Sequence, residues 1–534
     1  MRSPAIAMFC ALLLGGVALG AEPRLPKLVA YETGEFTVIT SRSSNQARQF
    51  IEDLTKFRIT LEKLLGKRAA ANPVPTRIVI VGAGDWRKYL QPRDNVAGFF
   101  QSARFTNTMA LDGDASRWFA TPLLFHEYSH YYLSSQFSGE YPPWFNEGLA
   151  ELMAYAMFTD QGRAVLRVPM HQVYEARDGD WIPFERLIQV DNYAPEYQSH
   201  KLMASFYAQA WLTVHYGFVG NREFGQKIIT YLNDLNSLRP QPEAARSAFG
   251  ADLAAMDQAL REYSRTTSFQ SGALSLGEVP PVDLPAGTPL GENDAYAVFI
   301  DVMFDTNFPP GRIRPLVEAL ARREPAAARP AIFAARLAAL EDDGAAFSAS
   351  VERARAALPA DDWQSRRELA AVLLDSALAT NPLSKRTSDD DDRDLKLALQ
   401  LSAEAVAHNG EDIEALWAFG SAASRLDRNL DLAEQALKTA YRLAPANGEI
   451  AVSLANLKGR QQEPDEMIPY LRDAIRYAGS LQTRRWAVDT LAEMQRYIAQ
   501  RDALEAENRK AREEYERKLA EHEKKYGKSK KKAP

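Results

Sequence analysis

Two histidines and a glutamate between Thr121 and Leu133, in the stretch TPLLFHEYSHYYL, have the types and spacing of a metal site. His126 and His130 are four positions apart, so a helix would carry both imidazoles on one face, where they can bind a common ion. Glu127 would project about a hundred degrees further round the helix, within reach of a water on that ion. The chain has only seven histidines in 534 residues, so this arrangement is unexpected by chance.

The chemistry that these residue types support is zinc-assisted hydrolysis. Catalytic zinc takes three protein ligands and leaves a fourth position for water, whose pKa falls to about 7. A carboxylate beside that water can accept its proton and later deliver it to a leaving amine. From Thr121 to Phe137 the chain carries no charge apart from this trio, and a metal explains charge retained on a buried helix. We therefore predict one zinc ion, with His126 and His130 as ligands and Glu127 as general base.

The third ligand is expected in YPPWFNEGLAELMAY, residues 141–155. Glu147 lies seventeen positions after His130, at the start of another helical run, and a helix–loop–helix return could bring it beside the histidines. Glu151, four residues later on the same face, could hold a ligand histidine by its other ring nitrogen. The alternative is that Glu147 is only an acidic residue near the start of a helix, where the macrodipole stabilises it, and that Glu151 faces solvent.

These two motifs together resemble the gluzincin zinc peptidases, whose HExxH is followed at a distance by NEGxAE. The wording PPWFNEGLAE is similar in particular to the bacterial peptidase-MA-like proteins, and the resemblance covers roughly residues 28–263. It implies a zincin-like metallopeptidase domain in which His126, His130 and Glu147 hold zinc and Glu127 is the catalytic base.

The resemblance also implies a tyrosine that donates a proton or stabilises the oxyanion. In SFYAQAWLTVHYG, residues 205–217, this role falls to Tyr207, since a phenol can donate to a developing oxyanion. Alternatively Tyr207 belongs to the core stripe of its helix, and Tyr193 and Tyr197 are then the other candidates. No GxMEN-like segment precedes the HExxH, so exopeptidase activity is not supported. Three further histidines are expected to be structural or exposed: His171, His200 and His215.

The elements that must position these residues are predicted from hydrophobic spacing. Residues 35–41 alternate like a strand, residues 48–65 have helical spacing, and residues 76–83 form a continuous apolar run typical of a buried strand. Residues 97–113 predict one or two strands, and the pattern after Gly113 is helical. A small sheet followed by helices predicts an α+β peptidase domain over residues 28–270.

The second half of the chain has a different composition. Residues 271–294 are rich in proline and glycine and predict a linker. Residues 295–500 are rich in alanine and leucine, and small residues and prolines recur as in tetratricopeptide repeats, for example Gly420, Ala433 and Pro445. We expect an all-α tetratricopeptide-like solenoid, with an unrelated helical bundle as the alternative. The acidic run at 384–394 is expected to be a solvated loop, and residues 501–534 a charged helical tail.

The amino terminus and the overall composition limit the location and the partners. Residues 1–20 have the pattern of a cleaved secretory signal peptide, which predicts a secreted or periplasmic protein without a membrane span after cleavage. The only cysteine, Cys10, lies in that segment, so thiol chemistry is excluded from the mature chain. The formal charge of −6 gives no electrostatic case for nucleic acid.

Two functions are consistent with the sequence. The first is a zinc metallopeptidase that hydrolyses peptides or proteins, with helical repeats that bind a protein partner or the substrate. The second is a non-catalytic zincin-like binding module that acts as a scaffold through its repeats. The intact Glu127 favours the enzyme, since a site without catalysis has no need of a base.

Overall fold

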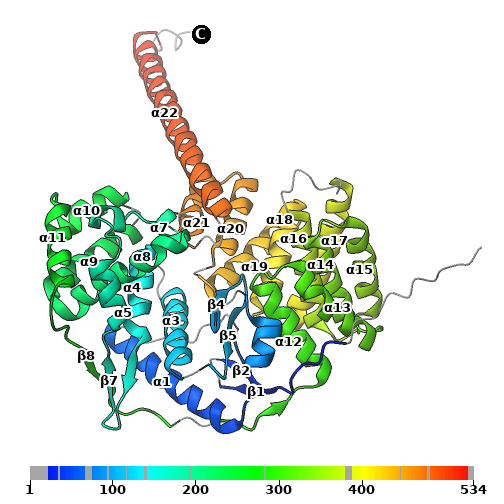
Figure 1. Cartoon of the computed structure of the whole chain (residues 1–534). Coiled ribbons are helices and arrows are strands. Elements are labelled where there is room, and N and C mark those ends of the chain that lie inside the picture. The colour runs from blue at the N-terminus through cyan, green and yellow to red at the C-terminus, as the bar shows by residue number, and fades with distance from the viewer. Residues whose placement is uncertain are drawn as a thin grey trace, which may run out of the picture.

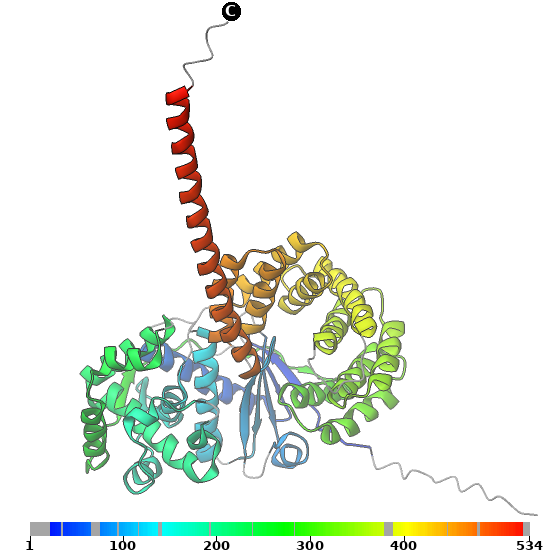
Figure 2. The same ribbon diagram turned by 90° about the horizontal axis from the view of Figure 1, so that it is seen from above.

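The structure, a computed structural model, describes most of the chain. It covers residues 22–33, 36–65, 75–92, 96–115, 117–136, 141–191, 194–237, 239–281, 284–378, 388–445, 447–477 and 481–526. The predicted signal peptide therefore lies outside the described residues. An α+β part is followed by an array of helices that curves back towards it, and one long helix projects from the body (Figures 1 and 2).

A six-stranded mixed sheet organises the first part, in the order β4-β5-β3-β2-β1-β9. Its strands are β1 (Val29–Glu32), β2 (Thr37–Thr40), β3 (Thr76–Val81), β4 (Gly98–Ser102), β5 (Asn107–Asp112) and β9 (Thr288–Pro289). β3 pairs in parallel with β2 and β5, whereas β4 runs antiparallel to β5 at one edge of the sheet. The strands predicted at 35–41, 76–83 and 97–113 are thus present, the last as two strands.

Both faces of this sheet are covered, which explains the continuous apolar run of β3. Ile78 and Ile80 belong to a core shared with α1 (Ser44–Leu65) and α3 (Arg117–Gln136). Val79 and Val81 face the opposite way, into a core shared with α12 (Glu292–Asp305) and α13 (Pro310–Arg323). Alternate residues of β3 are therefore buried in two separate cores, as expected for a central strand.

Helices fill the rest of the α+β part, and α4, α5 and α8 lie beside α3 in Figure 1. They are α2 (Ala83–Asp85), α4 (Pro143–Ala154), α5 (Met170–Asp178), α6 (Phe184–Leu187), α7 (Pro195–Gln198), α8 (His200–His215), α9 (Arg222–Asn236), α10 (Gln241–Phe249) and α11 (Leu253–Ser264), with π-helical turns η1 (Trp86–Leu90) and η2 (Tyr216–Gly220). A second sheet joins β6 (Ala156–Phe158), β7 (Arg163–Leu166) and β8 (Gly272–Ser275).

The described residues of the stretch 271–294, predicted as a linker, are part of the folded structure. β8 completes the second sheet, β9 pairs with β1, and α12 begins at Glu292. Its proline and glycine content reflects short edge strands joined by turns, because such strands need few residues and little apolar surface. The first two helices after it pack on the six-stranded sheet, so the two parts share a core.

Helix pairs form the array that follows, which confirms the predicted helical-repeat arrangement in the described part of the chain. The pairs are α14 (Ala328–Leu340) with α15 (Gly344–Ala357), α16 (Trp363–Leu378) with α17 (Ser388–His408), α18 (Ile413–Arg425) with α19 (Leu430–Leu443), and α20 (Gly448–Arg460) with α21 (Pro464–Arg476). Gly420 lets α18 approach α19, since a Cβ there would lie 2.5 Å from the Leu437 side chain. Small residues at helix crossings thus have the packing role that the sequence predicted.

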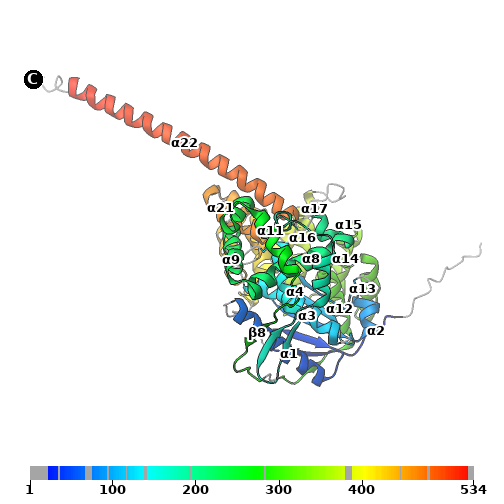
Figure 3. The same ribbon diagram turned by 60° about the vertical axis from the view of Figure 1, so that its left-hand side comes forward.

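At the acidic run and at the charged tail, the described helices extend further than the sequence predicted. Asp389, Asp390 and Asp391 lie in the first turn of α17, where carboxylates favour the helix dipole, so this part of the run is helix rather than loop. The tail belongs to α22 (Leu481–Tyr526), which begins against α21 and then projects away from the body (Figure 3). No helix among the described residues is long and apolar enough to cross a membrane.

Candidate metal centre

The three predicted ligands meet between α3 and α4. The Nε2 atoms of His126 and His130 are 3.1 Å apart, and Glu147 Oε2 lies 3.2 Å from the first and 3.5 Å from the second. α4 begins with Pro143 in its first turn, which fixes the start of the helix and places Glu147 opposite the histidine pair. Within the described residues, these three side chains are the group with the composition and spacing of a metal site.

The spacing of the three ligand atoms fits a tetrahedral ion. Bonds of about 2.0–2.1 Å to zinc require neighbouring ligand atoms about 3.3–3.4 Å apart, the value around which the three observed distances scatter. Apart from the two imidazoles, Glu147 Oε2 is buried without a polar partner, and a cation between the three atoms would satisfy it. The side chains present therefore fit a metal of the zinc type.

Interactions among the charged side chains of the cluster oppose the effect of burial on their pKa values. Burial alone lowers the pKa of His126, yet hydrogen bonds to Glu147 and Glu151 outweigh it and raise the pKa well above its usual range. Burial likewise lowers the pKa of His130, and the Glu147 charge raises it. Conversely, burial raises the pKa of Glu147, while the two histidines hold it well below its usual range. The centre thus combines one buried carboxylate with imidazoles that stabilise its negative charge.

Each histidine is also held by its second ring nitrogen. His126 Nδ1 lies 3.2 Å from Glu151 Oε1, as predicted, and Gln172 donates to the other oxygen of Glu151 at 2.8 Å. His130 Nδ1 lies 3.0 Å from Asn146 Oδ1. A carbonyl oxygen can only accept, so Nδ1 of His130 carries a proton and Nε2 is the nitrogen available to a ligand. The sequence analysis missed Asn146, although its place directly before Glu147 is a usable signal.

Glu127 is separate from the three-ligand group and contacts the edge of the sheet. Its Oε2 accepts a hydrogen bond of 3.2 Å from the backbone N–H of Phe100 in β4. Burial raises the pKa of Glu127, and the neighbouring histidines reduce this effect. A carboxyl group of raised pKa is the more basic when ionised.

The structure brings two of the three candidate tyrosines to the centre. The hydroxyl of Tyr197 donates to Glu147 Oε1 at 2.6 Å. The ring of Tyr207 stacks on His126 at 6.3 Å between centroids and on Tyr197 at the same distance. Burial, then the charge of Glu147, raises the pKa of Tyr207 well above its usual range, so its hydroxyl stays protonated as a donor. Tyr193 lies outside the described residues.

Two of the remaining histidines lie away from the centre. His215 Nε2 donates to the carbonyl oxygen of Gln270 at 3.1 Å, so its Nδ1 accepts from the Tyr263 hydroxyl at 2.8 Å. His171 contacts the ring of Tyr155. The side chain of His200 is outside the described residues.

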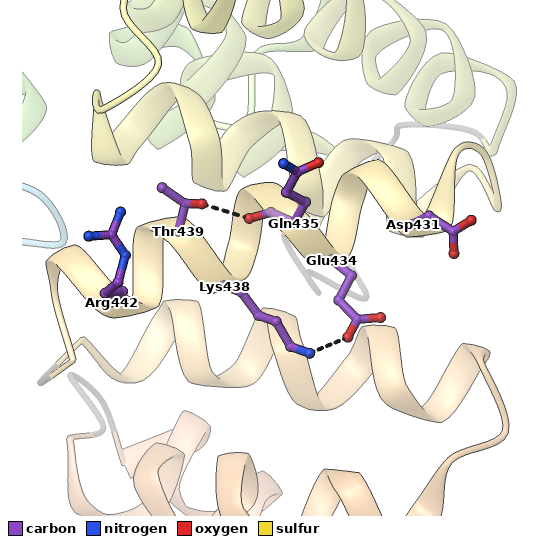
Figure 4. A pocket seen from close by; sticks show the side chains of 6 residues that line it. All are labelled: Asp431, Glu434, Gln435, Lys438, Thr439 and Arg442. Carbon is purple, nitrogen blue, oxygen red and sulfur yellow. Dashed lines mark hydrogen bonds and ion pairs between the residues drawn. The ribbon is translucent and has the colours of Figure 1, made fainter.

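A shallow hollow on the outer surface of α19 has polar walls that satisfy one another (Figure 4). Lys438 pairs with Glu434 at 2.5 Å, and Thr439 donates to the carbonyl oxygen of Gln435 at 2.9 Å. Glu434 also pairs with the buried Lys458 at 2.8 Å. The first two contacts lie within α19, and the Glu434–Lys458 pair joins α19 to α20, so the polar groups of the hollow already have partners in the fold.

Comparisons with known proteins were made for sequence and for structure. No protein-family model matches the chain, and no curated protein matches it in sequence. Ten solved chains are similar in structure. One is YrrB, described as a TPR protein with an unusual peptide-binding site, at 17% identity and a TM-score of 0.27, over 36% of this chain and 91% of that one. Another is PilF of Pseudomonas aeruginosa, at 13% identity and a TM-score of 0.28, over 39% of this chain and 90% of that one.

Proposed function

We propose that the chain is a zinc-dependent peptidase of the gluzincin type, with a zincin-like α+β part and a tetratricopeptide-like array. The observation that carries the proposal is the triangle of His126 Nε2, His130 Nε2 and Glu147 Oε2, whose edges of 3.1 to 3.5 Å suit one tetrahedral ion. Zinc held there supplies Lewis acidity, which polarises a peptide carbonyl and makes water acidic enough to react near neutral pH.

The residues around the ligands have separate tasks in this proposal. Glu127 accepts the proton of the attacking water and delivers it to the leaving amine, since it lies beside the ligands without joining them. Tyr207 donates a hydrogen bond to the oxygen on which negative charge develops. Glu151 and Asn146 keep the two imidazoles in the orientation and tautomer that present Nε2 to the ion.

The helical array is assigned a binding role for a protein partner or for the substrate. Support comes from its curvature and from its return to the sheet edge beside Glu127 (Figure 2). The second candidate function is a scaffold in which the α+β part binds metal without catalysis. A secreted or periplasmic location remains a prediction from residues 1–20.

Metal content of the purified protein tests the proposal first. We expect about one zinc per chain, and loss of most of it in His126→Ala and in Glu147→Ala, because each change removes one of three protein ligands. His408→Ala is the matched control, since that histidine stacks on Trp363 in the helical array and should leave the zinc in place. Full zinc occupancy in Glu147→Ala would show that the third ligand is assigned wrongly. Zinc binding without hydrolysis of any peptide in a broad library would favour the scaffold.

A further inference from the structure

The turn that joins β4 to β5, residues 103–106, is held by the helical array. The turn is closed by the Ala103 N–H, which donates to the Thr106 carbonyl oxygen at 2.9 Å. Its two central residues, Arg104 and Phe105, contact α16, α18 and α20, the first helices of three successive pairs. Segments more than 270 positions apart in the chain are thereby joined.

Arg104 is bound through three different kinds of contact. Its guanidinium forms an ion pair with Asp375 of α16 and lies 4.4 Å from the ring centre of Trp417 of α18. Its carbonyl oxygen accepts a hydrogen bond from the side chain of Asn447, the residue that also caps α20. The carboxylate and the aromatic face both contact the guanidinium, which can stack on a ring while it pairs with a carboxylate, whereas the Asn447 side-chain amide donates to the backbone of Arg104.

Phe105 adds an aromatic contact to the same surface. Its ring centre is 5.2 Å from that of Trp417, at an angle of 51°, and it packs against the core of the array. Trp417 is fixed in turn, because its indole N–H donates to Ser453 at 3.0 Å. The array thus presents a preformed aromatic platform for two successive side chains.

Carboxylates give this platform a negative potential. Burial lowers the pKa of Arg104, but the charges of Asp375, Glu449 and Glu414 outweigh it and raise the pKa. The surface is therefore suited to a cationic side chain.

We propose that the inner face formed by Asp375, Trp417 and Asn447 is a binding site for peptide segments in which arginine precedes an aromatic residue. In this structure the chain's own turn occupies that site. The contacts involve two side chains and one carbonyl oxygen, all of them from Arg104 and Phe105. Arg104 keeps 31% of its side-chain surface exposed and Asp375 keeps 51%, so a competing segment can reach both.

This inference rests on the proposed partner-binding role of the array, but not on peptidase activity. It has a consequence for the metal centre, because the N–H of Phe100, in the same strand β4, donates to Glu127. A partner that displaces the turn releases the end of β4 next to the turn. Phe100, in the same strand, contacts the proposed base Glu127. Binding at the array is thereby linked to the position of β4.

The test uses the full chain and a labelled peptide, Gln-Ser-Ala-Arg-Phe-Thr-Asn, which repeats residues 101–107. In the variant Arg104→Ala/Phe105→Ala the site is open, and the peptide should bind it in a fluorescence-anisotropy titration. The wild type should bind at least about tenfold more weakly, because the tethered turn competes at an effective concentration of millimolar order. A peptide with glutamate in place of the arginine is the matched control and should not bind.

Two further variants make the result decisive. Asp375→Asn in the open variant should abolish most of the binding, and Trp417→Leu should do the same, while zinc content stays unchanged in both. Absence of peptide binding to an open variant that melts cooperatively, or equal binding of the glutamate peptide, would overturn the inference. Loss of zinc alone would count against the metal centre and not against this site.

Discussion

Glu127 is half-buried and Glu147 is buried, and both lie next to the two histidines, yet their surroundings give the two carboxylates opposite properties. Imidazoles hold the pKa of Glu147 low, whereas burial keeps that of Glu127 raised. One carboxylate is therefore suited to hold a cation and the other to exchange a proton. The pattern HExxH predicts this division, but only the structure shows that a backbone N–H from β4 donates to Glu127.

The change Glu127→Gln separates proton transfer from metal binding. The amide oxygen can still accept the Phe100 N–H, so fold and zinc content should be unchanged. Peptidase turnover should fall by about 10²–10⁴-fold, because an amide cannot take a proton from water. Activity is measured on a quenched-fluorescent peptide library at matched zinc occupancy. Wild-type turnover in this variant would exclude Glu127 as the base.

Removing the hydroxyl of Tyr197 and that of Tyr207 should change two different quantities, zinc affinity and kcat. Tyr197 donates to Glu147 Oε1, so Tyr197→Phe should weaken zinc affinity by roughly 10–100-fold, the usual effect of losing a group that orients a ligand. Tyr207→Phe should leave zinc affinity unchanged and lower kcat by about 10²–10³-fold if its hydroxyl stabilises the oxyanion. Chelator competition and steady-state kinetics on both variants check this. If Tyr207→Phe weakened zinc affinity and Tyr197→Phe lowered kcat, the roles of the two tyrosines would be exchanged.

His215 makes stability depend on pH in a defined window. Burial lowers its pKa from 6.5 to about 4, so the folded protein prefers the neutral ring while the unfolded chain takes up a proton below pH 6.5. Stability is full above pH 6.5 and falls as the pH approaches 4, by at most about 3 kcal/mol. The urea midpoints of wild type and His215→Gln should therefore differ at pH 7.5 and lie closer together at pH 4.5. A constant difference between the two proteins would contradict the assignment.

At the scale of elements, α4 contacts α8 so closely that one position must be glycine. A Cβ on Gly148 would lie 2.3 Å from the carbonyl oxygen of Ala210 and 2.7 Å from Val214, in α8. Gly148→Ala should push α4 outwards with Glu147, lowering the free energy of unfolding by about 1–3 kcal/mol and weakening zinc binding. Gly311→Ala is the matched control, since no atom lies within 4 Å of a Cβ there. Unchanged melting and zinc affinity in Gly148→Ala would show that this contact is not restrictive.

The same scale shows why some elements were predictable and others were not. Strong periodicity predicted α1, β3 and the helix pairs, and ligand spacing predicted the site on α3 and α4, because these signals are local. Strands β8 and β9 are short edge strands that exist only because a partner strand lies beside them. Their sequence carries turn residues and no apolar pattern, so the linker prediction followed from local information alone. The contact of the β4–β5 turn with the array is likewise non-local.

At the scale of the molecule, the six-stranded sheet cannot be separated from the first two helices after β9. α12 and α13 cover the face that carries Val79 and Val81, and Arg77 of β3 pairs with Asp305 of α12 at 2.8 Å. A fragment of residues 22–290 would expose this face and leave Arg77 without its partner. We expect it to aggregate or to lack a cooperative thermal transition, since a sheet needs both faces covered when both are apolar. A fragment of residues 22–325 differs only by these two helices and should be soluble, melt cooperatively and bind zinc. A stable, zinc-binding fragment 22–290 would restore the boundary near residue 271 and make the α+β part an independent domain.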